Sequence, residues 1–182
     1  MAVAVPALAE FSSRLGAASW FSVIGESLTA AEHADVASYL MSLGLADMAT
    51  SEIASWSDAE ACIKATDWNS GWWDAEDRLR LNLLERAQQH FSKTVLLEAL
   101  TVLSEQVSDV VHGAAAVAAT RDGIADPGLI RAAAGAATMA CHQAAVGIAA
   151  DLTNDNPFMA KYRLFEAGHW PLCARGAVFY IF

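Results

Sequence analysis

The sequence predicts an all-α fold: a single domain over residues 1–182, built as a bundle of about six or seven helices around an Ala-rich antiparallel hairpin, with a short extended C-terminal tail. Three observations predict this class. Two long Ala-rich segments, Lys93 to Arg121 and Pro127 to Asp151, are separated by a short turn. Only the last few residues of the chain have the composition of a β-strand. A length of 182 residues fits one domain with a substantial core.

The first of the two Ala-rich segments has apolar residues at alternating steps of four and three. This spacing is typical of a helix that packs along a partner helix at a shallow angle. Ser92 can cap the start of the helix, and Gly123 can adopt the left-handed conformation that follows its end. The predicted seam consists of Leu96, Leu100, Leu103, Val107, Val110, Ala114 and Val117.

The second Ala-rich segment is small or apolar at nearly every position. A helix of this kind is normally buried on several sides, so we expect it to be the central helix of the fold. Ala137 and Ala144 lie on its predicted seam, and Gly135 and Gly147 would let neighbouring backbones approach closely.

The rest of the chain supplies the flanking elements. Capping boxes, in which a Ser or Thr side chain and a Glu three residues later close each other's backbone donors, predict two of the helix starts. The predicted helices are Pro6 to Leu15, Thr29 to Leu43, Ser57 to Ala65, Trp72 to Phe91, and Asn156 to Ala167 after the hairpin. Residues 18–24 are apolar and ambiguous in type, and residues 45–56 are predicted to be a connection.

The C-terminal tail begins at His169. Residues 174–176 resemble a turn, and Ala177 to Phe182 is the best strand candidate in the chain because its residues are β-branched and aromatic. No second strong strand is evident, so this segment is expected to pack as extended chain. Its large apolar side chains predict that it is ordered and docked, on its own helices rather than on a partner.

Composition restricts the class of function. The formal net charge is −10, with 21 acidic against 11 basic side chains, which argues against nucleic acid as a partner and is compatible with a basic protein partner. No secretion signal or membrane-spanning segment is predicted. The three cysteines are far apart in the sequence and form no CxxC pair, so a reducing cytoplasm of bacterial type is expected.

The first candidate site surrounds His142 in the central helix. Antiparallel pairing of the two Ala-rich helices would set it level with Glu105, Gln106 and Asp109. Such a group could hold a metal or move a proton, although the di-iron pattern of Glu-x-x-His on two helices is absent. The alternative is a structural histidine that is largely buried, hydrogen-bonded and uncharged near neutral pH. No catalytic motif, metal ion or cofactor is predicted.

The second candidate is a set of interaction residues. Three tryptophans cluster at residues 68–73, and basic residues lie close to aromatic ones towards the C-terminus of an otherwise acidic chain. Such a set could bind an anionic ligand or an acidic segment of a partner, or could pack on the protein's own core. Its members are Trp68, Trp72, Trp73, Lys161, Arg163, His169, Trp170, Arg175, Phe179 and Phe182.

Three functions are compatible with these observations. The first is a non-enzymatic module for protein–protein interaction, such as an adaptor, a chaperone-like binder or an inhibitor, because no chemically specific motif is present. The alternative is a helical-bundle enzyme or a ligand or metal carrier with a buried site around His142. A third is a homo-oligomeric subunit that associates through its Ala-rich face.

Overall fold

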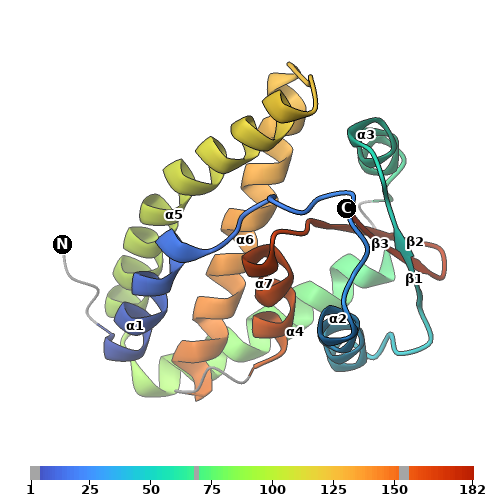
Figure 1. Cartoon of the computed structure of the whole chain (residues 1–182). Helices are drawn as coiled ribbons and strands as arrows, with labels where there is room; N and C mark the ends of the chain where they lie inside the picture. The colour runs from blue at the N-terminus through green and yellow to red at the C-terminus, as the bar shows by residue number, and fades with distance from the viewer. Residues whose placement is uncertain (1–4, 68–69, 152–155) are drawn as a thin grey trace.

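The computed structural model describes residues 5–67, 70–151 and 156–182 and is mostly helical (Figure 1). Among the described residues, no helix combines the length and the apolar character needed to cross a membrane. The helices are α1 (Pro6–Arg14), a short 3-10 helix (Leu15–Ala17), α2 (Ala30–Ser42), α3 (Trp56–Lys64), α4 (Gly71–His90), α5 (Lys93–Arg121), α6 (Pro127–Asp151) and α7 (Pro157–Ala167). The strands are β1 (Ala49–Glu52), β2 (Pro171–Arg175) and β3 (Val178–Ile181).

Helix α6 lies at the centre of the helical part, where α1, α4, α5 and α7 all pack against it. Ala137 and Ala144, on its predicted seam, are completely buried. Small side chains at these positions allow several helices to approach α6 at once. Most of the last two turns, from Gln143 to Ala150, is buried as well.

The buried face of α5 follows the predicted seam only as far as Val107. Val110 and Val117 are 41% and 71% exposed, and the buried stripe continues through Val111 and Ala115. A strict alternation of three and four has a period of 3.5 residues, and a straight α-helix drifts about 20° per heptad away from it. Over the length of α5 this drift moves the core face by about one residue.

Two glycines of α6 offer a matched pair of stability predictions. A Cβ atom at Gly135 would meet nothing within 4 Å, so Gly135→Ala should raise the free energy of unfolding by up to about 1 kcal/mol through helix propensity. A Cβ atom at Gly147 would overlap the side-chain amide of Asn156, whose Oδ1 accepts from the Met159 backbone N–H (3.1 Å) and caps α7. Gly147→Ala should therefore lower the free energy of unfolding by about 1–3 kcal/mol. Urea titrations of both variants check this, and stabilisation by both would refute the close approach of α6 and α7.

The prediction of an all-α fold needs correction, because the C-terminus belongs to a three-stranded sheet of order β1-β3-β2. Strand β3 is central, parallel to β1 and antiparallel to β2. The segment 45–56, predicted to be a connection, contains β1, and β2 extends into the predicted turn at residues 174–176. Strand β1 has the sequence Ala-Thr-Ser-Glu and is mostly exposed, so it lacks the apolar alternation that marks a strand in sequence.

The tail is ordered and docked on its own chain, as predicted. Phe179, Ile181 and Phe182 are at most 2% exposed. The Phe182 N–H donates to the Trp170 carbonyl (2.9 Å), and the Trp170 N–H donates to the Phe182 carbonyl (2.5 Å). These bonds extend the ladder between β2 and β3 to the last residue.

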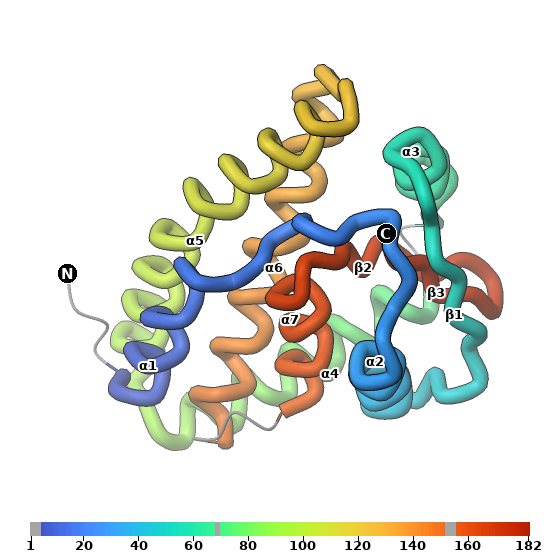
Figure 2. The backbone as a smooth tube through the Cα atoms, viewed as in Figure 1, coloured from blue at the N-terminus to red at the C-terminus, as the bar shows by residue number. Residues whose placement is uncertain are grey.

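Local sequence signals explain the ends of several helices. The capping box of α2 forms as predicted between Thr29 and Glu32. Helix α3 begins at Trp56, one residue before the predicted start at Ser57. Its N-cap is Ser55 rather than Ser57, and the Ser55 side chain accepts from the Asp58 N–H (3.2 Å). Residues 18–29 run as an irregular segment that crosses α6 and passes the C-terminal end of α7 (Figure 2), where the Ser19 N–H donates to the Glu166 carbonyl.

Candidate functional site

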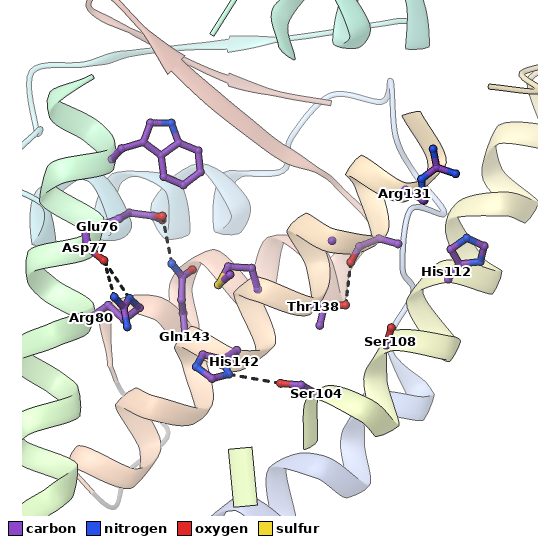
Figure 3. A pocket seen from close by; sticks show the side chains of 14 residues that line it. Glu76, Asp77, Arg80, Ser104, Ser108, His112, Arg131, Thr138, His142 and Gln143 are labelled. Atoms are coloured by element: carbon purple, nitrogen blue, oxygen red, sulfur yellow. Dashed lines mark hydrogen bonds and ion pairs between the residues drawn. The ribbon is translucent and has the colours of Figure 1, made fainter. Parts of the chain in front are cut away.

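A groove opens over α6 between α4 and α5. These two helices both pack against α6 but hardly touch each other, which leaves a cavity of about 730 Å³ between them (Figure 3). The surface of the cavity is mostly apolar. Its lining consists of Trp73, Glu76, Asp77, Arg80, Ser104, Ser108, His112, Arg131, Ala134, Gly135, Thr138, Met139, His142 and Gln143.

The floor of the groove is one face of α6. Ala134, Gly135, Thr138, Met139 and His142 follow helical spacing and face the space between α4 and α5. Ala134 and Gly135 have small side chains or none, which leaves space above this face of α6. Met139 is 50% exposed although it is apolar. An apolar side chain at the bottom of an open groove is typical of a binding site.

One end of the groove carries two basic side chains. His112 from α5 and Arg131 from α6 lie near each other there (Figure 3). In the part of the chain that the structure describes, no ion pair or hydrogen bond holds the Arg131 guanidinium. This end therefore offers an uncompensated positive charge within a protein of net charge −10.

The opposite side of the groove, formed by α4, carries paired charges. Arg80 donates to Asp77 in a pair three residues apart in α4, with an N–O distance of 2.6 Å. Next to it, the Gln143 Nε2 group donates to the Glu76 carboxylate (3.2 Å). Both acids of the cavity lining therefore have a hydrogen-bond donor, and each is also paired with a cation, Asp77 with Arg80 and Glu76 with Lys161.

Behind this wall lies a buried ionic network. The Glu76 carboxylate accepts hydrogen bonds from the Tyr39 hydroxyl and from Lys161 Nζ (2.5 Å), and Lys161 also donates to the Gln143 amide oxygen (3.3 Å). Glu76 is 2% exposed and Lys161 is 6% exposed. The network joins α2, α4, α6 and α7, and it fixes the two groups, Glu76 and Gln143, that reach the groove.

Aromatic rings complete this network. The Trp72 indole N–H donates to the Tyr39 oxygen (2.9 Å), and Lys161 Nζ lies 5.6 Å and 5.5 Å from the centres of the Tyr39 and Trp72 rings. These distances are within the range of cation–π attraction. Burial, and then the Glu76 charge, raise the pKa of the Tyr39 phenol well above its ordinary value, so the phenol remains a donor to the carboxylate.

His142 lies in the groove as a half-buried side chain. Its Nδ1 atom is 3.4 Å from the Ser104 hydroxyl of α5. Burial, and to a lesser extent the Arg80 charge, lower the pKa of His142 below its ordinary value, which is the predicted direction, although the side chain is half-buried rather than largely buried. A second hollow of about 380 Å³ adjoins the groove and shares Ser104, Ser108, Thr138 and His142 with it.

Of the residues predicted to surround His142, only Glu105 lines a hollow together with it, and no hydrogen bond joins the two among the described residues. Glu105 lines only the second hollow, the Gln106 amide oxygen accepts from the Ser12 hydroxyl of α1 (2.7 Å), and Asp109 is exposed. Ser104 is the neighbour that the prediction missed. Among the described residues, no group of three His, Cys, Asp or Glu side chains could hold a metal ion.

Most of the predicted interaction residues lie inside the protein. Trp73 lines the groove, Arg163 pairs with Asp35 (2.6 Å) and Arg175 is exposed, while Trp68 falls outside the described residues. The buried members are Trp72, Lys161, His169, Trp170, Phe179 and Phe182.

Glu76, Arg80 and Arg131 line the groove but were not among the predicted site residues. Glu76 carries a signal that could have revealed it: together with Trp72, Leu79 and Leu83 it follows the inward stripe of α4. An acid on an apolar stripe requires a buried partner. No comparable signal in the sequence marks the half-buried Arg80 or the exposed Arg131.

Comparison of the chain with models of known protein families, with curated proteins and with solved structures found no match in any of the three. We therefore infer the function of the groove from its own residues and geometry.

Proposed function

We propose that this protein binds a small organic molecule in the groove between α4, α5 and α6. The observation that carries the proposal is the cavity of about 730 Å³, mostly apolar and with polar groups at both ends. Sites for small molecules typically enclose about 300–1,000 Å³ and combine apolar walls with a few polar groups that fix orientation.

The lining also indicates the chemistry of the ligand. Arg131 and His112 favour an anionic group at one end, because the acids of the lining already have donors. Ala134, Gly135 and Met139 favour an apolar body, and the pair Glu76–Gln143 favours a hydrogen-bonding group at the far end. The ligand class that fits is an elongated amphipathic anion.

Binding fits these side chains better than catalysis. Glu76 is held by three donors and is not free to act as a general base. The His142 ring contacts the Ser104 hydroxyl, but among the described residues no carboxylate orients this ring, as a working nucleophile–base pair requires. The interaction-module hypothesis was based on the absence of a chemically specific motif, and most of its candidate interaction side chains are buried, so we place ligand binding first.

Two matched fluorescent probes test the proposal. Anilinonaphthalene sulfonate is an aromatic anion, and N-phenylnaphthylamine is its neutral counterpart. We expect one-to-one saturable fluorescence with both probes and tighter binding of the sulfonate at low salt. Arg131→Gln should weaken the sulfonate about threefold to tenfold and leave the neutral probe unchanged. Equal affinity for the two probes would refute the anionic end of the ligand, and binding of neither would refute the groove.

A steric variant locates the probe. Gly135→Trp directs a large side chain into the groove, because a Cβ atom at this position meets nothing within 4 Å, and it should abolish binding of both probes. Gly113→Trp is the control: Gly113 is an exposed helical glycine of α5 with equal free space and does not line the groove. A Gly113→Trp variant that binds no better than Gly135→Trp would place the probe elsewhere.

A further inference from the structure

Two cysteines that are distant in sequence meet inside the protein. The Sγ atoms of Cys62 in α3 and Cys173 in β2 lie 2.7 Å apart, and the two residues are 4% and 2% exposed. A covalent disulfide has a sulfur–sulfur distance of about 2.05 Å. A shift of well under 1 Å therefore separates this contact from a bond.

The surrounding fold holds this contact in place. Cys173 pairs with Tyr180 of β3 in the sheet, and α3 packs chiefly against β2. Trp56, at the start of α3, packs edge-on against Phe182 and donates from its indole N–H to Asp122 (2.9 Å). The third cysteine, Cys141, lies in α6 and is completely buried.

We propose that Cys62 and Cys173 are a site of reversible oxidation, and that their disulfide fastens α3 to the sheet. Cys141 takes no part and stays a thiol. This inference does not depend on the ligand in the groove.

A small disulfide such as oxidised glutathione serves as the oxidant. The thiolate of Cys62 attacks one sulfur of the oxidant, forms a mixed disulfide and releases one glutathione thiolate. The thiolate of Cys173 then attacks the Cys62 sulfur and releases the second glutathione. The protein loses two electrons and two protons, and one oxidised glutathione becomes two reduced glutathione molecules.

Burial determines how the reaction starts. Desolvation, and then the neighbouring Cys173, raise the pKa of the Cys62 thiol to about 12, so little thiolate exists while α3 is docked. Attack therefore requires α3 to lift from β2, after which closure returns the two sulfur atoms to contact. Oxidation should be slow, and the disulfide once formed should be protected from reductants.

The test uses the full reduced chain, incubated in glutathione buffers of increasing oxidised fraction, denatured and alkylated, then digested and analysed by mass spectrometry without reduction. We expect a peptide that links residues 62 and 173, and an alkylated Cys141. The oxidised chain should melt several degrees higher than the reduced one, because the bond closes a long loop and restricts the unfolded chain. Dithiothreitol should reverse both changes.

Variants separate this proposal from nonspecific oxidation. Cys141→Ala should keep the link and the rise in melting temperature, whereas Cys62→Ala should lose both. The wild-type peptide map decides the question even where a variant folds poorly. The proposal is overturned by a link that includes Cys141, by stable glutathione adducts on Cys62 or Cys173, or by alkylation of both thiols after oxidation.

Discussion

Replacement of Lys161 by methionine is expected to lower the free energy of unfolding by about 3–5 kcal/mol. The substitution leaves the Glu76 carboxylate buried without its cation, and breaking a buried ion pair from one side typically costs this much. The paired side chains are only 7% and 3% exposed, so water cannot compensate. Chemical denaturation followed by far-ultraviolet circular dichroism measures the effect.

Two controls make this prediction specific. The double variant Glu76→Leu with Lys161→Met removes both charges and should recover much of the loss, because apolar replacements of a buried pair are often neutral. Arg86→Met breaks the pair of Arg86 with Asp151, whose side chains are 51% and 20% exposed, and should cost about 1 kcal/mol or less. If Lys161→Met costs no more than Arg86→Met, the buried network does not hold α4, α6 and α7 together.

Deletion of residues 179–182 should abolish cooperative unfolding. It removes most of the central strand, and with it three side chains that are almost completely buried. Burial of each large apolar side chain contributes about 1.5–3 kcal/mol, so the loss approaches the whole stability of a typical domain. Thermal melts of the truncated and full chains check the prediction.

Single substitutions in β3 provide a graded version of this experiment. Phe179 is completely buried, and Phe179→Ala should cost about 3–5 kcal/mol. Tyr180 points to the other face of the strand and is half-buried, so Tyr180→Ala should cost clearly less. Equal effects, or a truncated chain that melts like the full one, would contradict the docking of the tail.

Helices were predictable from this sequence because their signals are local. The capping box of α2 and the apolar spacing of α5 act within a few residues. The sheet was not predictable, because β1 consists of Ala-Thr-Ser-Glu and becomes a strand only through its pairing with β3, more than a hundred residues away. Backbone pairing of this kind leaves little trace in the composition of an edge strand.

The candidate site was predictable only in part. The antiparallel pairing of α5 and α6 predicts which residues lie at the same height along the two helices. Successive residues of a helix point about 100° apart, so an error of one residue in the pairing brings a different side chain next to His142. His142 therefore meets Ser104 rather than Glu105. The ionic network joins Tyr39, Glu76 and Lys161 from three helices that are far apart in the sequence, and no local spacing relates them.

The most direct test of ligand binding in the groove is an NMR titration with anilinonaphthalene sulfonate that monitors the ring signals of the five histidines. His112 and His142 line the groove, whereas His33, His90 and His169 do not. In the free protein, His142 should titrate below the ordinary pKa of a histidine, because burial disfavours its charged form. We expect the probe to shift the signals of His112 and His142 in a saturable way and to leave the other three unchanged. Unchanged signals of His112 and His142 at saturating probe would contradict it.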